Sequence, residues 1–163
     1  ADFIARQPAP CNMLIPGCGS AWEAGFLAEH GWPVTALDFS PLAVNAAREV
    51  LGDAPVDLVC DDFFTFIPRR PTQLIYERAF LCALPRKLWT NWGRRVAELL
   101  PGGGLLAGYF FLCEQPKGPP FGIQPEQLDE LLAANFERIE DAAVDDSIPV
   151  FLGKERWQVW RRR

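Results

Sequence analysis

The sequence has no hydrophobic run long enough to cross a membrane and no excess of basic residues. Its longest apolar stretch, from Leu105 to Cys113, is far shorter than the ~20 residues of a transmembrane helix. The chain does not open on a basic segment followed by an apolar one, which is the pattern of a secretory signal. The net charge of −5 disfavours binding to a phosphate backbone. We therefore expect neither a membrane nor a nucleic acid as a partner.

Histidine is nearly absent, and cysteine occurs in an odd number. The five cysteines lie mostly in or beside predicted strands, where free thiols pack as small apolar groups. Unpaired cysteines are typical of a reducing compartment, so we expect a cytoplasmic protein. The one histidine, His30, precedes Gly31 at the end of a predicted helix, and we assign it a helix-end role instead of that of a catalytic base. No motif predicts a metal site.

The 163 residues suffice for one domain with its own core, and no repeat or linker divides them. Short apolar runs bounded by glycine and proline predict strands, and the capped or amphipathic segments between them predict helices. The expected strands are residues 13–15, 34–37, 56–60, 74–79, 105–112, 136–144 and 157–161. The expected helices are residues 23–29, 42–51, 85–100 and 125–135.

Strands that alternate with helices predict a mostly parallel sheet, covered by helices on both faces. The last two strands are joined by a segment too short for a helical crossover, so we expect an antiparallel last strand. This is a Rossmann-like α/β fold of one domain, residues 1–163, whose size is compatible with a monomer. A ligand would bind at the carboxyl ends of the first strands, where the strand order reverses.

A glycine turn and an acidic residue predict a nucleoside site at that edge. Gly17, Cys18 and Gly19 follow the first strand, where the missing side chains let a ligand lie against the backbone. Asp38 ends the second strand, about 20 residues further on, where a carboxylate accepts both hydroxyls of a ribose. The order strand, glycine turn, helix, strand and acid is typical of nucleoside-binding proteins.

The identity of the nucleoside depends on Trp22. Dinucleotide-binding proteins have the motif Gly-x-Gly-x-x-Gly at such a turn, and its last position is Gly or Ala, which lets the pyrophosphate approach the helix. Gly17 and Gly19 match the first two glycines, and Trp22 stands at the last position. S-adenosylmethionine carries no phosphate and fits a turn with a bulky residue better. The sequence also lacks a Tyr-x-x-x-Lys set for hydride transfer. A methyltransferase is therefore favoured, and a nicotinamide-dependent oxidoreductase is the alternative.

The third strand ends on a group that suits an adenine ring. Asp62 can accept a hydrogen bond from the adenine amino group, while Phe63 or Phe64 covers the ring face. For Asp61, capping of the following turn is an equally good interpretation. Further aromatic residues would form an apolar acceptor pocket or pack in the core, namely Trp22, Phe39, Phe63, Phe80 and Phe121.

Five segments, in order along the chain, resemble the thiopurine methyltransferase-like family, which includes bacterial thiol, halide and chalcogen methyltransferases. The resemblance extends from about Leu14 to Trp160, and five motifs in register are far more specific than any one of them. They are Leu-Ile-Pro-Gly-Cys-Gly-Ser-Ala-Trp-Glu at 14–23, Leu-Asp-Phe-Ser-Pro-Leu-Ala at 37–43, Asp-Asp-Phe-Phe at 61–64, Tyr-Glu-Arg-Ala-Phe-Leu-Cys-Ala-Leu-Pro at 76–85 and Gly-Pro-Pro-Phe at 118–121.

The resemblance implies a class I methyltransferase fold with a seven-stranded sheet, and S-adenosylmethionine as the cofactor. The acceptor would be a small molecule, either a thiol or a related sulfur, selenium, tellurium or halide nucleophile. A protein that binds adenosylmethionine without catalysis is the alternative. Position by position, the implied cofactor contacts are Gly17, Cys18 and Gly19 to the methionine portion, Asp38 and Phe39 to the ribose, and Asp62 and Phe63 to the adenine.

Arg78, at the end of the fourth strand, matches an arginine that faces the active site in similar enzymes. It is the expected catalytic residue on the substrate side, and it also borders the cofactor. The alternative is an ion pair with Glu77 or with a helix. Members of the family carry an N-terminal tryptophan-rich segment that folds over the cofactor, and this sequence starts too late to contain it. We therefore expect a less closed pocket.

Overall fold

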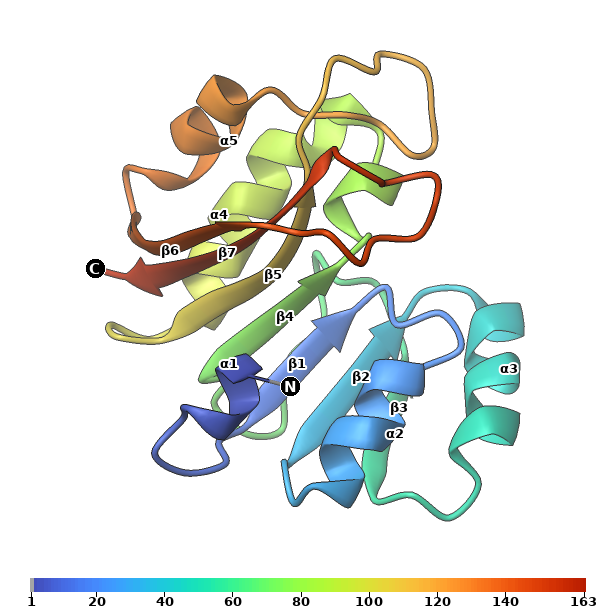
Figure 1. Cartoon of the computed structure of the whole chain (residues 1–163). Coiled ribbons are helices and arrows are strands. Elements are labelled where there is room, and N and C mark those ends of the chain that lie inside the picture. Colours follow the sequence, from blue (N-terminus) through green and yellow to red (C-terminus); the bar gives the residue numbers. More distant parts are fainter. Residues whose placement is uncertain (1) are drawn as a thin grey trace.

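The computed structural model describes residues 2–163, so residue 1 of the expected domain lies outside the described part. The core of the structure is a seven-stranded sheet in the order β3-β2-β1-β4-β5-β7-β6 (Figure 1). β7 runs antiparallel to β5 and β6, its two neighbours, and the other pairs are parallel, which confirms the expected mostly parallel sheet with an antiparallel last strand. The strands are β1 (Met13–Pro16), β2 (Val34–Asp38), β3 (Val56–Cys60), β4 (Leu74–Arg78), β5 (Leu105–Phe111), β6 (Phe136–Ala143) and β7 (Glu155–Arg162).

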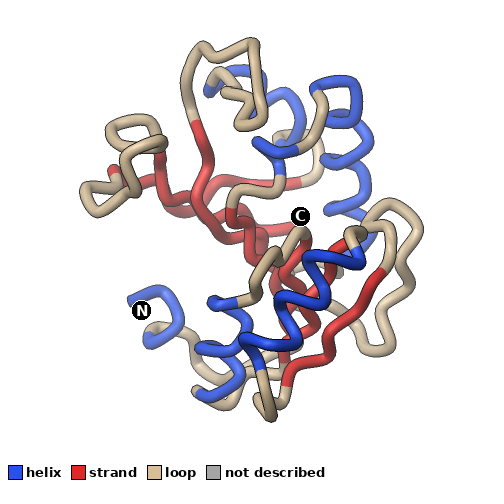
Figure 2. Tube along the Cα trace, turned by 90° about the vertical axis from the view of Figure 1, so that its right-hand side faces the viewer, coloured by secondary structure: helices blue, strands red, loops and turns tan. Residues whose placement is uncertain are grey.

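Helices lie on both sides of the sheet, as Figure 2 shows in a side view. Helix α2 packs against α3 on one face, and α4 packs against α5 on the other. None of the helices in the described chain is long and apolar enough to span a membrane. The helices are α1 (Asp2–Ala5), α2 (Trp22–Glu29), α3 (Pro41–Leu51), α4 (Trp89–Leu99) and α5 (Pro125–Leu132), with short 3-10 turns η1 (Leu81–Ala83) and η2 (Arg86–Leu88).

Two hydrophobic cores form because successive side chains of a strand point to opposite faces. Met13 and Ile15 of β1 pack with α2 and α3, whereas Leu14 packs with α4 and α5. Trp92 of α4 is completely buried in the second core. Because both faces of β1 are covered, the strand is apolar throughout and its carboxyl end is held rigidly at one edge of the sheet.

The expected helix at residues 85–100 starts four residues too early, and the expected strand at residues 157–161 starts two residues too late, because β7 begins at Glu155. Leu84 and Pro85 are extended, and the chain then passes through η2 before α4 begins at Trp89. The indole N–H of Trp89 donates to the carbonyl of Leu84 at 3.1 Å, which holds this extended stretch against the helix. The helix expected at residues 125–135 ends earlier, since α5 stops at Leu132. The N–H of Asn135 then donates to the Leu132 carbonyl at 3.0 Å in the turn that follows.

The expected cap of α3 is confirmed and carries a prediction. The hydroxyl of Ser40 accepts a hydrogen bond from the N–H of Ala43 at 3.3 Å, and Pro41 is the first helical residue. Ser40→Ala leaves this N–H without its partner, so we expect a loss of about 1 kcal/mol in the free energy of unfolding, measured by urea titration. Ser40→Thr keeps a capping hydroxyl and is expected to lose less. Equal stability of all three proteins would contradict this role.

Candidate active site

The glycine turn after β1 presents backbone to open space at one position only. Gly17 and Gly19 both have a positive φ, 61° and 52°. A Cβ atom on Gly17 would overlap the ring of Phe80, so this glycine permits close packing within the protein. Around Gly19, the space that a Cβ would occupy holds no atom of the described chain within 4 Å. Gly19 is therefore the point of the turn where a ligand can lie against the backbone.

Asp38, at the end of β2, is bonded directly to this turn. Its carboxylate accepts the N–H of Gly19 at 3.1 Å through one oxygen and the N–H of Ser40 at 2.9 Å through the other. The N–H of Cys18 donates to the carbonyl of Leu37 at 3.0 Å, which ties the same two segments together. Each carboxylate oxygen has a second lone pair, so Asp38 can accept further hydrogen bonds from a ligand.

The third strand ends beside the second. The N–H of Asp61 donates to the carbonyl of Asp38 at 3.1 Å, and the ring of Phe39 is 77% exposed. The carboxylate of Asp62 accepts the N–H of Phe64 at 2.9 Å, and that of Asp61 accepts the N–H of Asp62 at 2.7 Å. Both acids thus shape this turn, and the capping interpretation of Asp61 fits the structure.

Phe63 occupies a different place from the other residues expected around the cofactor. Its side chain is 4% exposed and belongs to the core under α4. The rings of Phe64 and Phe80 meet it edge to face, with centroids at 5.4 and 5.1 Å. The ring of Phe63 is therefore held inside the protein, and its carbonyl accepts a hydrogen bond from Nε of Arg95 on α4 at 3.1 Å, whereas the side chain of Asp62 lies in the turn that follows β3.

Arg78, the last residue of β4, lies in a cluster with three partners: Glu23 of α2 is the ion pair with a helix that the sequence analysis gave as an alternative, whereas Tyr109 and Glu155 were not expected. Its Nη1 donates to the carboxylate of Glu155, and its Nε lies 3.8 Å from a carboxylate oxygen of Glu23. The guanidinium carbon lies 4.7 Å from the centre of the Tyr109 ring. We call these four residues the Arg78 cluster. The sheet brings Arg78, Tyr109 and Glu155 together, because β5 and β7 lie beyond β4 in the strand order, and Glu23 comes from α2.

The alternative pairing of Arg78 with Glu77 does not form. Glu77 points to the other face of β4, where one carboxylate oxygen accepts the N–H groups of Phe80 and Leu81 at 2.7 and 3.1 Å. This carboxylate is buried, 1% exposed, and it fixes the turn that follows Arg78. Burial raises the pKa of Glu77 to about 7, against the lowering effect of the two N–H groups and of Arg78.

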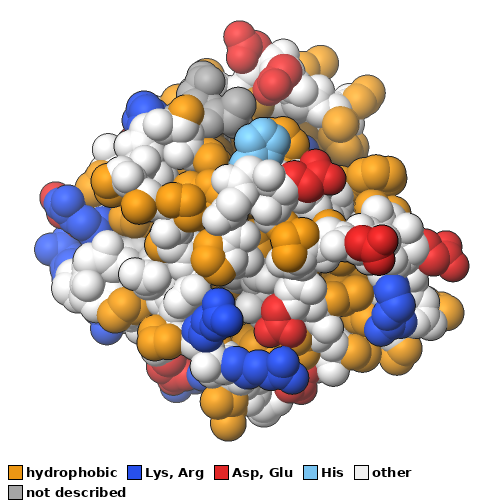
Figure 3. All heavy atoms as spheres, turned by 90° about the horizontal axis from the view of Figure 1, so that it is seen from below, with side chains coloured by type: hydrophobic (Ala, Val, Ile, Leu, Met, Phe, Trp, Pro, Cys, Tyr) orange, Lys and Arg blue, Asp and Glu red, His pale blue; other side chains and the backbone are white. Residues whose placement is uncertain are grey.

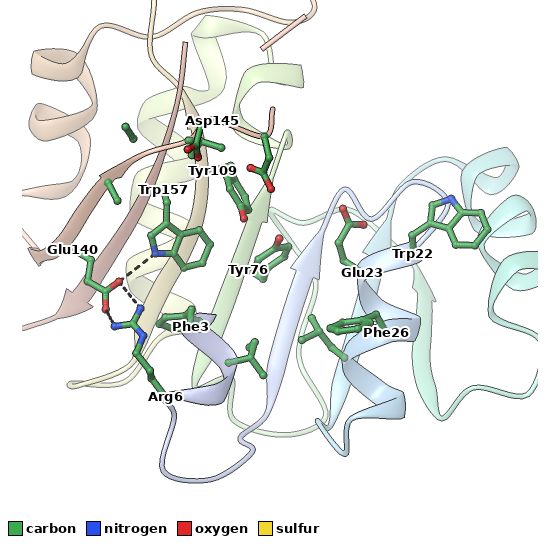
Figure 4. Close-up of a pocket in the computed structure, with 16 residues that line it drawn as sticks. Phe3, Arg6, Trp22, Glu23, Phe26, Tyr76, Tyr109, Glu140, Asp145 and Trp157 are labelled. Carbon is green, nitrogen blue, oxygen red and sulfur yellow. Dashed lines mark hydrogen bonds and ion pairs between the residues drawn. The ribbon is translucent and has the colours of Figure 1, made fainter. Parts of the chain in front are cut away.

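An aromatic groove of about 770 Å³ adjoins the Arg78 cluster (Figure 4). Tyr76, Tyr109 and Trp157 form its floor on β4, β5 and β7, and Trp22 and Phe26 line it from α2. Two members of the Arg78 cluster line this groove, Tyr109 in its floor and Glu23 on α2. The aromatic residues expected around an acceptor are dispersed instead: Trp22 lines this groove, Phe39 is exposed, and Phe63, Phe80 and Phe121 pack with the core.

The thiols near the sequence motifs are poor nucleophiles in this setting, and the histidine lies at a helix end. Burial raises the pKa of the Cys18 and Cys82 thiols to about 12, with nearby carboxylates adding to the shift, so both stay protonated at neutral pH. His30 is the C-cap of α2, with Nδ1 2.7 Å from the carbonyl of Phe26. Figure 3, which views the molecule from below, shows a histidine exposed among apolar and acidic side chains.

The profile of the thiopurine S-methyltransferase (TPMT) family matches residues 2–163. The chain belongs to the thiopurine S-methyltransferase family. Thiopurine S-methyltransferase of Shewanella putrefaciens is 33% identical over 171 residues, covering 91% of this chain and 78% of that protein. Thiocyanate methyltransferase 1 of Arabidopsis thaliana is 28% identical, covering 93% of this chain and 69% of that protein. Probable thiol methyltransferase 2 of the same plant is 29% identical over 159 residues, covering 93% of this chain and 70% of that protein.

Solved structures show the same fold. A TehB-like S-adenosylmethionine-dependent methyltransferase of Corynebacterium glutamicum superimposes with a TM-score of 0.77 at 18% identity, over 99% of this chain and 85% of that one. The N-methyltransferase NodS of Bradyrhizobium japonicum, in complex with S-adenosylhomocysteine, superimposes with a TM-score of 0.77 at 17% identity, over 94% of this chain and 79% of that one. This member of the thiopurine S-methyltransferase family is thus an S-adenosylmethionine-dependent methyltransferase of class I fold, and the nicotinamide-dependent alternative is not supported.

Proposed function

We propose that this enzyme transfers the methyl group of S-adenosylmethionine to a small soft nucleophile, most readily a thiol, or to a related selenium, tellurium or halide acceptor. The relatives named above are thiopurine, thiocyanate and probable thiol methyltransferases, which supports this acceptor class. The observation that carries the proposal is the bond between the carboxylate of Asp38 and the N–H of Gly19. This bond supports the assignment of Asp38 to the ribose, because it holds the carboxylate beside the open part of the glycine turn.

The cofactor would lie along the carboxyl edge of β1, β2 and β3. We assign Gly17, Cys18 and Gly19 to its methionine portion, Asp38 and Phe39 to its ribose, and Asp62 and Phe63 to its adenine. The proximity of the three strand ends supports this order, because Gly19 and Asp61 both donate to Asp38. For Phe63, whose ring is buried, the assignment concerns its backbone in the turn that follows β3.

S-adenosylmethionine supplies a methyl carbon that its sulfonium charge already activates, so the protein mainly has to align the reactants. Arg78 would stabilise the anionic form of the acceptor, since a nearby cation lowers the pKa of a thiol. The acceptor proton would leave to solvent, and as the acceptor sulfur bonds to the methyl carbon, the bond between that carbon and the sulfonium sulfur would break and S-adenosylhomocysteine would leave. Cys18, protonated beside the glycine turn, would not compete as an acceptor.

We further propose that residues 1–163 act as one domain and as a cytoplasmic monomer that does not bind nucleic acid. The net charge of −5 and the unpaired state of the cysteines Cys11, Cys18, Cys60, Cys82 and Cys113 support this assignment. Analytical ultracentrifugation would test it, because a dimer at micromolar concentration would contradict the monomer.

The experiment that tests the function has two stages. Isothermal titration calorimetry with S-adenosylhomocysteine and with NAD tests the cofactor, and we expect binding of the first only. A mass-spectrometric screen with S-adenosylmethionine then tests thiols, selenite, tellurite and iodide for methylated products, and we expect methylation of a thiol. Binding of NAD alone would overturn the cofactor assignment. Cofactor binding without any methylated product would indicate the non-catalytic alternative.

A further inference from the structure

We propose that Glu155 is a positioning residue that orients the guanidinium of Arg78 toward the methyl acceptor. The proposal deepens the function proposed above and depends on it, because Arg78 is assigned there to the acceptor side. Glu155 is the first residue of β7, and its carboxylate accepts the charge-assisted hydrogen bond from Nη1 of Arg78.

The antiparallel direction of β7 explains how Glu155 reaches this place. Parallel strands deliver their last residues to the carboxyl edge of the sheet, whereas β7 delivers its first one. Glu155 pairs with Phe111 at the end of β5, and Arg78 pairs with Tyr109 two residues earlier. Both charged residues therefore stand on rigid strands, with β5 between them, and a site on strands holds its geometry better than one on loops.

Burial makes this ion pair different from a surface pair. The side chain of Glu155 is 4% exposed and that of Arg78 is 26% exposed. A carboxylate that has lost its water needs a cation nearby, so Glu155 has a strong preference for one position of the guanidinium. Its second oxygen is buried and has no hydrogen-bond partner within residues 2–163. The carboxylate thus depends mainly on Arg78 for compensation.

The rest of the Arg78 cluster leaves one side of the guanidinium available. The ring of Tyr109 lies against its face at 4.7 Å, and Glu23 approaches Nε at 3.8 Å from a position that is 42% exposed. Nη2 makes no hydrogen bond within the described chain. Glu155 binds Nη1 and the ring of Tyr109 covers one face, so the plane of the Arg78 guanidinium has a fixed orientation. Nη2 can then donate a hydrogen bond to an anionic acceptor.

A double-mutant cycle tests this role. Arg78→Met, Glu155→Gln and the double variant would be assayed with S-adenosylmethionine and 4-nitrothiophenol, a chromogenic thiol, together with melting temperatures and calorimetry with S-adenosylhomocysteine. We expect Glu155→Gln to lower kcat/KM for the thiol about tenfold, which corresponds to one lost oriented hydrogen bond to a charged group. The KM for S-adenosylmethionine and the affinity for S-adenosylhomocysteine should stay within about twofold, which a general loss of structure would not allow.

The effect of Glu155→Gln in the Arg78→Met protein shows whether Glu155 acts by orienting Arg78 or only by supporting the fold. If Glu155 acts through Arg78, Glu155→Gln adds less than about a twofold loss to Arg78→Met. Glu137→Gln is the control for the loss of an exposed ion pair on the same sheet, because Glu137 pairs with Arg161 between β6 and β7 at 2.8 Å, outside the Arg78 cluster. We expect wild-type kinetics for it.

Three results would overturn the proposal: unchanged kcat/KM in Glu155→Gln, an equal loss in the presence and absence of Arg78, or a parallel loss of cofactor affinity. If Glu155→Gln unfolds at the assay temperature, Glu155→Asp takes its place in the cycle, and a loss that vanishes in the Arg78→Met background is again required. Failure of the proposed function appears already in the wild-type protein, as an absence of cofactor binding or thiol methylation.

Discussion

Replacing Asp38 by alanine is expected to weaken the binding of S-adenosylhomocysteine by about a hundredfold or more, measured by isothermal titration calorimetry. A hydrogen bond to a charged group contributes about 1.5–3 kcal/mol, and each 1.4 kcal/mol is tenfold in affinity. The proposed ribose contact would lose two such bonds. Alanine also removes the acceptor for the N–H groups of Gly19 and Ser40, so the turn itself loses its support.

Two further variants show whether the loss of affinity comes from the missing acceptor oxygens of Asp38. Asp38→Asn keeps one acceptor oxygen, so we expect it to retain more of the affinity than Asp38→Ala. Asp57→Ala is the matched control, because Asp57 is an acid of the adjacent strand β3 whose nearest cation, Arg69, lies 3.8 Å away in solvent. We expect wild-type affinity for this control. If Asp38→Ala bound as tightly as the wild type, the nucleoside site would have to lie elsewhere.

Glu77 is expected to make the folded protein less stable as the pH rises from about 4.5 to about 7. Its pKa is raised to about 7, mainly because burial disfavours the charged carboxylate. The folded state therefore holds this proton more tightly than the unfolded state, whose pKa is 4.5. The stabilising contribution is complete below pH 4.5 and is lost as the pH rises through the folded pKa. The loss is on the order of 3 kcal/mol, at 1.36 kcal/mol per pKa unit.

Glu77→Gln removes this titration and keeps an oxygen for the N–H groups of Phe80 and Leu81. Urea unfolding of both proteins between pH 4.5 and 8 measures the effect as a difference between two curves. The contributions of the other carboxyl groups are the same in both proteins and cancel in that difference. One of them is Glu140, whose pKa is lowered mainly by the hydrogen bond that Arg6 donates to it. We expect the variant to gain relative stability as the pH rises. Parallel curves across this range would show that the buried carboxyl does not titrate there.

The fold was largely predictable because its signals are local. Alternating short apolar runs and capped helices each depend on a few neighbouring residues, and Ser40 with Pro41 marks the start of α3 as expected. The start of α4 was not predictable, since the sequence around Pro85 permits a helix there. A contact across the turn, from Trp89 to Leu84, favours the extended form instead.

The two halves of the candidate site differed in how far the sequence predicted them. Gly19 and Asp38 belong to one βαβ unit, so their spacing alone indicates that they meet, and the structure joins them by a hydrogen bond. Glu155 lies in the run Lys154-Glu155-Arg156, which has the composition of a solvated loop. Its meeting with Arg78 depends on the order and register of three strands, and such long-range pairing leaves no trace in a short window.

Phe63 illustrates the remaining difficulty. Two adjacent aromatic residues after a strand are compatible with a ligand contact or with core packing, and neither composition nor spacing separates the two. The structure places the ring of Phe63 in the core and leaves Phe64 partly buried. An aromatic side chain gains about as much from either environment, so only the tertiary structure decides between them.

The insertion of β7 between β5 and β6 has a consequence for biosynthesis. Chains emerge from the ribosome in sequence order, so β6 is made before the strand that will join it to the rest of the sheet. Until β7 arrives, β6 has no neighbour, and Arg78 lacks the carboxylate that accepts from it. A polypeptide released early, before residue 155, would therefore carry the glycine turn and Asp38 but an incomplete centre. The Arg78 cluster can therefore assemble only after residue 155 has been synthesised.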